Sequence, residues 1–124
     1  VARGYSANPK HLVEMIKGAI THKGFSFLDV FSPCVTYNKD NTYKWFRPRV
    51  KPLEDEGHDP TNFHKSMDKA YLWGDEIPIG LFWHRTDLPT LEEQEPVLDE
   101  GGPLGYRELG LSKEQSSDLI KEML

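Results

Sequence analysis

The sequence predicts an α/β fold, with a parallel sheet in its first part and a proline-rich extension in its second. The first observation is the order of the opening 31 residues, where two short apolar segments flank a helical pattern, as in a right-handed strand–helix–strand unit. The second is a change of composition beyond residue 50, where most of the nine prolines and several acidic runs are found. We therefore predict two parts, residues 1–50 and residues 51–124.

A helix is predicted over residues 9–23. Asn8 is a favoured N-cap residue, Pro9 suits the first helical position, and Gly24 favours the left-handed conformation that ends helices. The apolar residues between them recur at helical spacing: Leu12, Ile16, Ala19 and Ile20. Residues 25–31, apolar on both faces, then predict a strand buried in a parallel sheet, and residues 1–5 predict the end of a neighbouring strand.

Two more helices are predicted in the second part. Asp59 as N-cap and Pro60 as the first helical residue indicate a helix over residues 60–73. Ser112 and Gln115 have the spacing of a capping box and introduce a terminal helix. The same spacing occurs at Thr90 and Glu93.

One strand and one loop complete the second part. Residues 77–83 alternate like a strand, but Pro78 and Gly80 restrict that strand to a sheet edge or a hairpin. The glycine-rich residues 101–105 lack the preceding strand and the following Lys of a phosphate-binding loop, so we predict an ordinary loop there.

The composition indicates one modest domain without a membrane-spanning segment. The chain has 124 residues, 37% of them hydrophobic, and has no apolar run long enough to span a bilayer. Its single cysteine excludes an internal disulfide and no secretory signal is recognisable, so we expect a cytoplasmic protein. The net charge of -5 argues against nucleic-acid binding, and we interpret the basic residues 44–51 as a solvated face beside aromatic packing.

Cys34 is the residue whose chemistry decides the functional prediction. It follows a predicted strand, at the edge of the sheet where α/β proteins bind ligands. From the residues alone three interpretations stay open: a cofactor ligand, a nucleophile paired with a histidine, and a small buried apolar side chain. A zinc site is not expected, because no second thiol is present and His58, His64 and His84 are far apart in the sequence.

Several collinear segments carry a family resemblance, and Phe31-Ser32-Pro33-Cys34 is the most informative of them. The segments are residues 1–6, 9–12, 19–25, 29–38, 41–43, 56–61 and 73–80. Together they resemble the carboxyl-terminal part of the beta subunit of 2-oxoacid:ferredoxin oxidoreductases. The resemblance covers most of residues 1–95.

The resemblance implies a thiamine-diphosphate-binding-type parallel sheet and a set of cofactors. The family's beta subunit binds thiamine diphosphate and Mg²⁺ through a Gly-Asp-Gly motif followed by an Asn, which this sequence lacks. It holds a 4Fe-4S cluster with three cysteines from its amino-terminal half and a fourth from a Pro-Cys turn, which only Cys34 matches here. Asn38, Asn41 and Thr42 follow this turn and are candidates to bind cofactor or substrate, although an Asn turn and a helix cap at Asn41 explain them equally.

The implied activity is the CoA-dependent oxidative decarboxylation of a 2-oxo acid, with electrons passing through the cluster to ferredoxin. The implied partners are the alpha subunit, ferredoxin, the 2-oxo acid and CoA; no catalytic side chain is expected in this chain, which should be inactive alone. Residues 35–39 favour enzymes that use 2-oxoglutarate or several 2-oxo acids. The alternative is a non-catalytic assembly module, in which Cys34 is buried and Trp73, Phe82 and Trp83 contact another protein.

Overall fold

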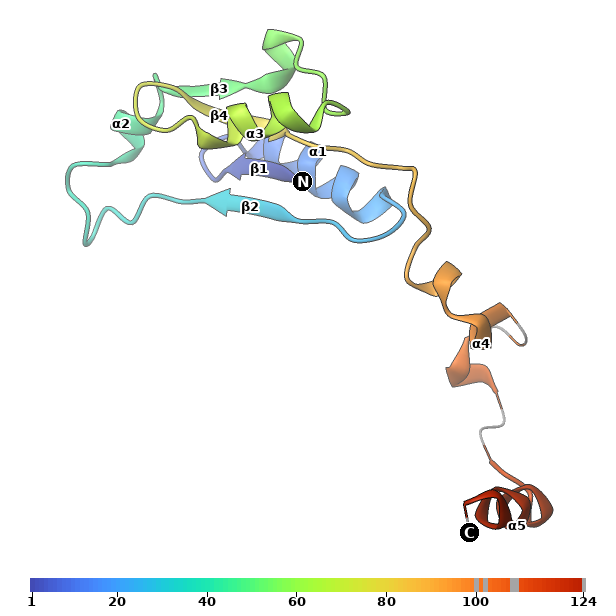
Figure 1. The fold of residues 1–124 in the computed structure, drawn as a ribbon. Coiled ribbons are helices and arrows are strands. Elements are labelled where there is room, and N and C mark those ends of the chain that lie inside the picture. The colour runs from blue at the N-terminus through green and yellow to red at the C-terminus, as the bar shows by residue number, and fades with distance from the viewer. Residues whose placement is uncertain (100, 102, 108–109, 124) are drawn as a thin grey trace. The chain divides into compact units, whose positions relative to one another are not determined.

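The computed structural model describes residues 1–99, 101, 103–107 and 110–123. These residues form two compact units, the sheet unit Val1–Leu88 and the carboxyl-terminal unit Pro89–Leu124. Figure 1 traces both units along the chain. The predicted boundary after residue 50 differs from this division and stays a prediction.

A mixed four-stranded sheet forms the centre of the sheet unit. Its strands are β1 Ala2–Tyr5, β2 Leu28–Phe31, β3 Val50–Pro52 and β4 Ile77–Leu81, in the order β2-β1-β4-β3. β1 runs parallel to β2 and β3 runs parallel to β4, but β1 and β4 are antiparallel. The α/β class and the parallel pairing of the first two strands are therefore confirmed, but the complete sheet is mixed and not parallel, because β4 runs antiparallel to β1. The residues of β1 and β2 do not indicate which strand pairs with the second edge of β1, because that strand, β4, is distant in the sequence.

The position of β4 also differs from the prediction of an edge strand or hairpin, because β4 lies between β1 and β3. Ile77 donates its N–H to the Arg49 carbonyl on the β3 side, at 2.8 Å. The backbone N–H groups of successive strand residues point alternately to the two neighbouring strands. Because the Ile77 N–H points to the β3 side, the nitrogen of Pro78 faces β1. The ladder with β1 joins only Gly80 and Leu81 of β4. A proline is tolerated in this inner strand because no N–H is needed where it lies.

Helix α1, Pro9–Thr21, packs against β1. The Asn8 side chain accepts a hydrogen bond from the His11 N–H at 3.4 Å, which confirms the predicted cap, and the helix ends two residues before the predicted position. A Cβ added to Gly4 of β1 would lie 2.5 Å from Cδ1 of Leu12. Gly4 thus allows the helix to approach the strand closely.

Three short elements follow β2. They are α2 Tyr43–Phe46, the 3₁₀ helix η1 Leu53–Glu56, and α3 Phe63–Tyr71. The predicted helix over residues 60–73 begins three residues later than expected, because Asn62 is the N-cap and accepts a hydrogen bond from Lys65 N–H at 3.1 Å. Asp59 binds the Thr61 N–H and hydroxyl instead, at 2.9 and 2.7 Å.

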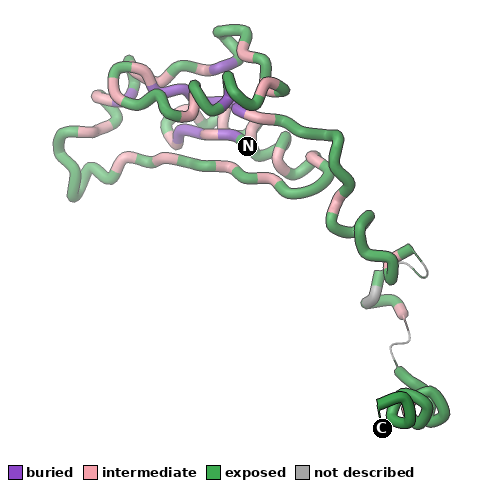
Figure 2. The backbone as a smooth tube through the Cα atoms, in the orientation of Figure 1, coloured by how far each residue is buried: buried purple, intermediate pink, exposed green. Residues whose placement is uncertain are grey.

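The core of the sheet unit is small and largely aromatic. Its buried members are Tyr5, Phe46, Ile77 and Ile79, and Phe31, Trp45 and Val50 pack against them. The rings of Tyr5 and Phe31 are stacked with centroids 4.7 Å apart, and Trp73 meets Phe31 edge-on at 6.0 Å. Figure 2 shows that the buried residues lie within this unit, while the carboxyl-terminal unit has none among its described residues.

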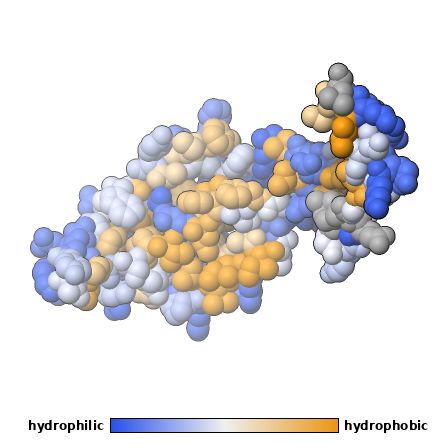
Figure 3. Space-filling model, turned by 90° about the horizontal axis from the view of Figure 1, so that it is seen from below, coloured by the Kyte–Doolittle hydropathy of each residue, from blue (hydrophilic) through white to orange (hydrophobic). Residues whose placement is uncertain are grey.

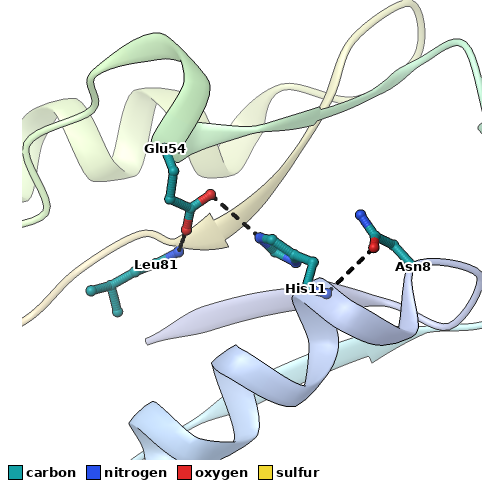
Figure 4. A network of polar contacts seen from close by, with 4 residues as sticks. All are labelled: Asn8, His11, Glu54 and Leu81. Carbon is teal, nitrogen blue, oxygen red and sulfur yellow. Dashed lines mark hydrogen bonds and ion pairs between the residues drawn. The ribbon is translucent and has the colours of Figure 1, made fainter.

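A carboxylate closes the space between α1 and β4 (Figure 4). Glu54 of η1 accepts a hydrogen bond from Leu81 N–H at 3.2 Å, and its other oxygen lies 3.3 Å from Nε2 of His11. Through this side chain η1 is joined to both a strand and a helix that are distant in the sequence.

The strand predicted to be buried over residues 25–31 is shorter and more exposed than expected. β2 begins at Leu28, and Phe25 and Phe27 before it are 86% and 54% exposed. β2 is an edge strand paired only with β1, so the described residues offer no element that covers its outer side. Figure 3, which views the molecule from the β2 side, shows apolar side chains gathered on this face.

The carboxyl-terminal unit consists of short helices: η2 Glu92–Gln94, α4 Pro96–Asp99, η3 Leu104–Tyr106 and α5 Lys113–Glu122. The capping box of α5 is confirmed, since Ser112 and Gln115 bind each other's N–H at 3.2 and 2.9 Å. Within the predicted 101–105 loop, Gly102 lies outside the described residues, and part of the remainder belongs to η3. Among the described residues no helix is both long and apolar enough to cross a membrane.

Candidate functional site

Cys34 lies in the loop that follows β2, at one end of the sheet unit (Figure 1). Tyr5 and Phe31 are register partners, and Ser6 N–H donates to the Phe31 carbonyl at 3.1 Å, so parallel β1 and β2 end side by side here. The predicted position at the carboxyl edge of parallel strands is confirmed. The thiol is exposed, so Cys34 is not a buried apolar side chain in this structure.

Hydrogen bonds within the loop fix its shape. Asn38 N–H donates to the Cys34 carbonyl at 2.9 Å, and the Lys39 ammonium donates to the Val35 carbonyl at 2.9 Å. The Asn38 side-chain oxygen accepts from the N–H groups of Asp40 and Asn41, at 3.0 and 2.8 Å. A loop with this many internal bonds holds its thiol in a defined position, as a ligand to a rigid group requires.

The three candidate binding residues after the thiol have different roles in the structure. Asn38 forms the turn through its carbonyl oxygen, as an Asx turn does. The N-cap of α2 is Thr42 rather than Asn41, and its hydroxyl makes no capping hydrogen bond. Within the part of the chain that the structure describes, the side chains of Asn41 and Thr42 have no hydrogen-bond partner, so both remain available to a ligand.

A group of hydroxyls surrounds the base of this loop, and it was not predicted from the sequence. It consists of Tyr5, Ser6, Ser32 and Tyr43. The neighbouring hydroxyl of Ser32, and to a smaller extent that of Ser6, lowers the pKa of Tyr43. Burial raises the pKa of Tyr5. The available signal was that Ser6 and Ser32 each follow one of two neighbouring parallel strands.

The Tyr5 hydroxyl is the clearest sign of an absent neighbour. The residue is 4% exposed, and its hydroxyl has no partner among the described residues. A buried hydroxyl without a hydrogen bond costs about 1–3 kcal/mol. This cost favours a polar ligand group beside Tyr5.

The histidines do not form a catalytic pair with Cys34 in the structure. His11 faces Glu54, His58 lies 2.8 Å from the Phe82 carbonyl, and His22 stacks edge-on against His84. No hydrogen bond joins any of the five histidines to Cys34 within the described ranges. The interpretation of Cys34 as a histidine-activated nucleophile therefore has no support in the geometry.

Cys34 also cannot bind a metal with the described residues alone. They contain no group of three or more His, Cys, Asp or Glu side chains placed to hold an ion. A cleft of about 420 Å³ lies elsewhere, lined by Val1 and Ala2 at the start of β1 and by His22 and Trp83. A ligand set that includes the thiol therefore needs residues beyond those that the structure describes.

Comparison with known proteins identifies a family match that includes the loop of Cys34. Residues 34–100 match the family described as the C-terminal part of the pyruvate ferredoxin oxidoreductase beta subunit, and the match begins at Cys34 itself. It spans more than half of the chain. The chain belongs to this family.

Related proteins place the chain within a longer subunit. The 2-oxoacid:ferredoxin oxidoreductase beta subunits of Sulfolobus sp and Saccharolobus solfataricus are 41% and 42% identical to it over 104 residues. Each alignment covers 76% of this chain and 34% of the relative. The chain thus spans about a third of the length of these relatives and corresponds to the carboxyl-terminal region of the beta subunit.

A solved structure shares the fold. It is the 2-oxoglutarate:ferredoxin oxidoreductase from Magnetococcus marinus with 2-oxoglutarate, coenzyme A and succinyl-CoA bound. The two structures superpose with a TM-score of 0.75 at 32% sequence identity, over 99% of this chain and 40% of the other. The mixed sheet and its helices are therefore the arrangement found within this enzyme family.

Proposed function

We propose that this chain is the carboxyl-terminal region of the beta subunit of a cytoplasmic 2-oxoacid:ferredoxin oxidoreductase. The complete enzyme would carry out the CoA-dependent oxidative decarboxylation of a 2-oxo acid, together with an alpha subunit, and reduce ferredoxin. The observation that carries the proposal is the family match that begins at an exposed thiol on a rigid loop. This chain would supply one ligand of the iron–sulfur cluster and no catalytic side chain.

The assigned role of Cys34 is to ligate a 4Fe-4S cluster together with three cysteines from outside this chain. Thiolates are the usual ligands of such clusters, and the cluster, when bound, supplies a one-electron carrier. The residues fit this group, because the thiol is exposed and Tyr5 contributes a buried hydroxyl that lacks a partner among the described residues. Hydrogen bonds to sulfur and the extent of burial tune the potential of such clusters.

The thiamine diphosphate and Mg²⁺ of the enzyme would be bound mainly outside this chain, since the described residues hold no acidic metal site. Asn41 and Thr42 are the proposed contacts from this chain to cofactor or substrate, because their side chains are free in the described structure. Asn38 is the weaker candidate, because its carbonyl oxygen is already used by the turn, although its amide N–H groups remain available.

The proposed substrate is 2-oxoglutarate. Support comes from residues 35–39 and from the 32% identity to an enzyme solved with 2-oxoglutarate bound. The test compares kcat/KM for 2-oxoglutarate and pyruvate with the complete enzyme. A clear preference for pyruvate would contradict the substrate assignment without affecting the family assignment.

Replacement of Cys34 tests the central claim. Full-length beta subunit is prepared anaerobically with its alpha subunit as wild type, Cys34→Ala and Cys34→Ser, and iron, acid-labile sulfide and the visible spectrum are measured. We expect Cys34→Ala to lose most of its intact cluster and its reduction of ferredoxin. Val35→Ala, in the same loop, is the control and should keep both, because Val35 contacts Lys39 only through its backbone carbonyl.

The second candidate is an assembly module without a redox role. The exposure of Trp73, 57%, and of Phe25 and Phe27 favours contact with another protein surface. Phe82, also assigned to such a contact, is instead buried beside Arg3, with the guanidinium 5.0 Å from its ring. Unchanged iron and sulfide in Cys34→Ala would favour this second candidate.

A further inference from the structure

Positive charge is concentrated in the segment that contains Cys34. Residues 32–51 include five basic side chains and one acidic side chain, Asp40, so the segment carries a charge of +4. The complete chain has 15 basic and 20 acidic residues and a charge of -5, which leaves -9 for the rest. The basic residues are Lys39, Lys44, Arg47, Arg49 and Lys51.

In the described part of the chain these five cations have no carboxylate partners, whereas five of the cations outside the segment do. Arg3, Lys17, Lys69, Arg85 and Lys121 each form an ion pair. Within the described ranges no ion pair involves a basic residue of segment 32–51. The charge next to the thiol is therefore not neutralised by the residues that the structure describes.

Three of the five side chains form an exposed basic rim beside the loop of Cys34. They are Lys39, Lys44 and Arg47. Arg49 is half-buried and lies 4.2 Å over the ring of Trp45, so it has a packing role, and Lys51 belongs to β3. Lys39 lies in the loop after β2, Lys44 lies in α2, and Arg47 is the C-cap of α2. Figure 1 shows this loop and α2 at the same end of the sheet unit.

We propose that the basic rim docks an acidic patch of the electron-acceptor protein and brings that protein to the cluster bound by Cys34. The inference rests on the proposed function, because it assumes that electrons leave through this cluster. Electron-transfer proteins bind each other through small interfaces and dissociate quickly. Complementary charge on the two proteins raises their association rate more than the lifetime of the complex. Unpaired cations around an exposed ligand loop provide such complementarity.

The rim is better suited to a protein than to nucleic acid. Duplex-binding proteins typically neutralise about 6–10 phosphates. The rim has three exposed cations, with Asp40 between two of them in the sequence. An acidic patch on a small protein can match three cations, whereas a phosphate backbone would require a longer basic surface.

The test reverses charge at Lys44 and Arg47 in the complete enzyme. Lys39 is left unchanged because its ammonium also holds the loop through the Val35 carbonyl. With a ferredoxin of net negative charge as probe, we expect Lys44→Glu/Arg47→Glu to lower kcat/KM at low salt by about tenfold, within the range of electrostatic steering. The ferredoxin dissociation constant, measured directly by calorimetry, should rise, and both effects should shrink as ionic strength increases.

Two controls separate docking from damage. Lys65→Glu reverses one charge at an exposed residue in the first turn of α3, where a Glu is well tolerated, and should leave ferredoxin reduction unchanged; the single variants Lys44→Glu and Arg47→Glu are its charge-matched counterparts. Iron and sulfide content and the reduction of methyl viologen, a small acceptor, should equal those of the wild type in every variant. If the double variant fails to assemble, Lys44→Gln/Arg47→Gln is used with the same readouts.

The outcomes distinguish failure of the proposed function from failure of the docking inference. A wild-type enzyme that reduces neither viologen nor ferredoxin would overturn the proposed function and, with it, the docking inference. Normal viologen reduction together with unchanged ferredoxin kinetics and affinity in the double variant would overturn the docking inference alone. Binding of an RNA duplex at physiological ionic strength that the double variant loses would assign the rim to nucleic acid and would also overturn the inference.

Discussion

Gly80 shows how one residue without a side chain permits the contact between β4 and η1. Its φ is +119°, a conformation that other residues rarely adopt, and a Cβ added there would lie 2.6 Å from both carboxylate oxygens of Glu54. Those oxygens face Leu81 N–H and His11, so they cannot move away without losing these partners. We expect Gly80→Ala to lower the free energy of unfolding by about 1–3 kcal/mol, measured by urea denaturation.

Gly18 is the matched control for Gly80. It lies in α1, and an added Cβ would meet no atom within 4 Å. Gly18→Ala is expected to raise the free energy of unfolding by about 0.5–1 kcal/mol, because alanine favours a helix interior. Equal effects of the two substitutions would contradict the explanation.

The ion pair between Glu56 of η1 and Lys69 of α3 predicts a pH dependence. The hydrogen bond from Lys69 is the main cause that lowers the pKa of Glu56. A carboxyl whose pKa is lower in the folded state stabilises the fold above its unfolded pKa, and this stabilisation is lost as the pH falls through the folded pKa. We expect Glu56→Gln to lose about 0.5 kcal/mol at pH 7, within the range of surface pairs.

Unfolding measured at acidic pH tests the contribution of this ion pair. As Glu56 becomes protonated below its lowered pKa, the unfolding curves of wild type and Glu56→Gln should converge. Glu14→Gln is the control. The side chains of the Glu14–Lys17 ion pair are almost two-thirds exposed, so this pair should contribute little to the free energy of unfolding at either pH. A difference at Glu56 that persists in acid would indicate lost packing rather than lost charge.

At the scale of elements, the start of α3 depends on Asn62 and not on Asp59. Asn62 accepts from Lys65 N–H, whereas Asp59 is occupied by Thr61 in a separate turn. Asn62→Ala should lower the free energy of unfolding by about 1 kcal/mol, the usual value of an N-cap, in urea denaturation. Lys65→Ala, in the same turn, keeps the capped backbone N–H and should have a smaller effect; the reverse order would place the cap elsewhere.

At the scale of the whole molecule, the division into two units predicts that the sheet is stable without residues 89–124. All four strands and the buried core belong to Val1–Leu88. We expect a chain that ends at residue 88 to keep slow amide hydrogen exchange in β1 and β4, because their partners are retained. Loss of this protection on truncation would show that residues 89–124 support the sheet directly.

Local features could be predicted well from the sequence, for physical reasons visible in particular residues. Asn8 and Ser112 cap their helices through hydrogen bonds that span three residues, so the signal and the structure lie in the same segment. Cys34 was placed correctly at the end of a strand, because the apolar segment and the polar turn are adjacent in the chain. The polar groups around the thiol were only partly predicted, since Tyr5 and Ser6 come from another strand.

What the sequence determined by itself was therefore the α/β class, the capped starts of α1 and α5, and a single thiol in the loop after β2, since each depends on neighbours within a few residues. The tertiary structure alone decided that β4 runs antiparallel to β1 as an inner strand, that β2 is an edge with exposed apolar residues, and that hydroxyls from separate strands meet beside Cys34. These features follow from pairing between segments that are distant in the sequence. Pro78 is tolerated because the neighbouring strand needs no N–H from it, and Phe25 is exposed because no described element packs against it.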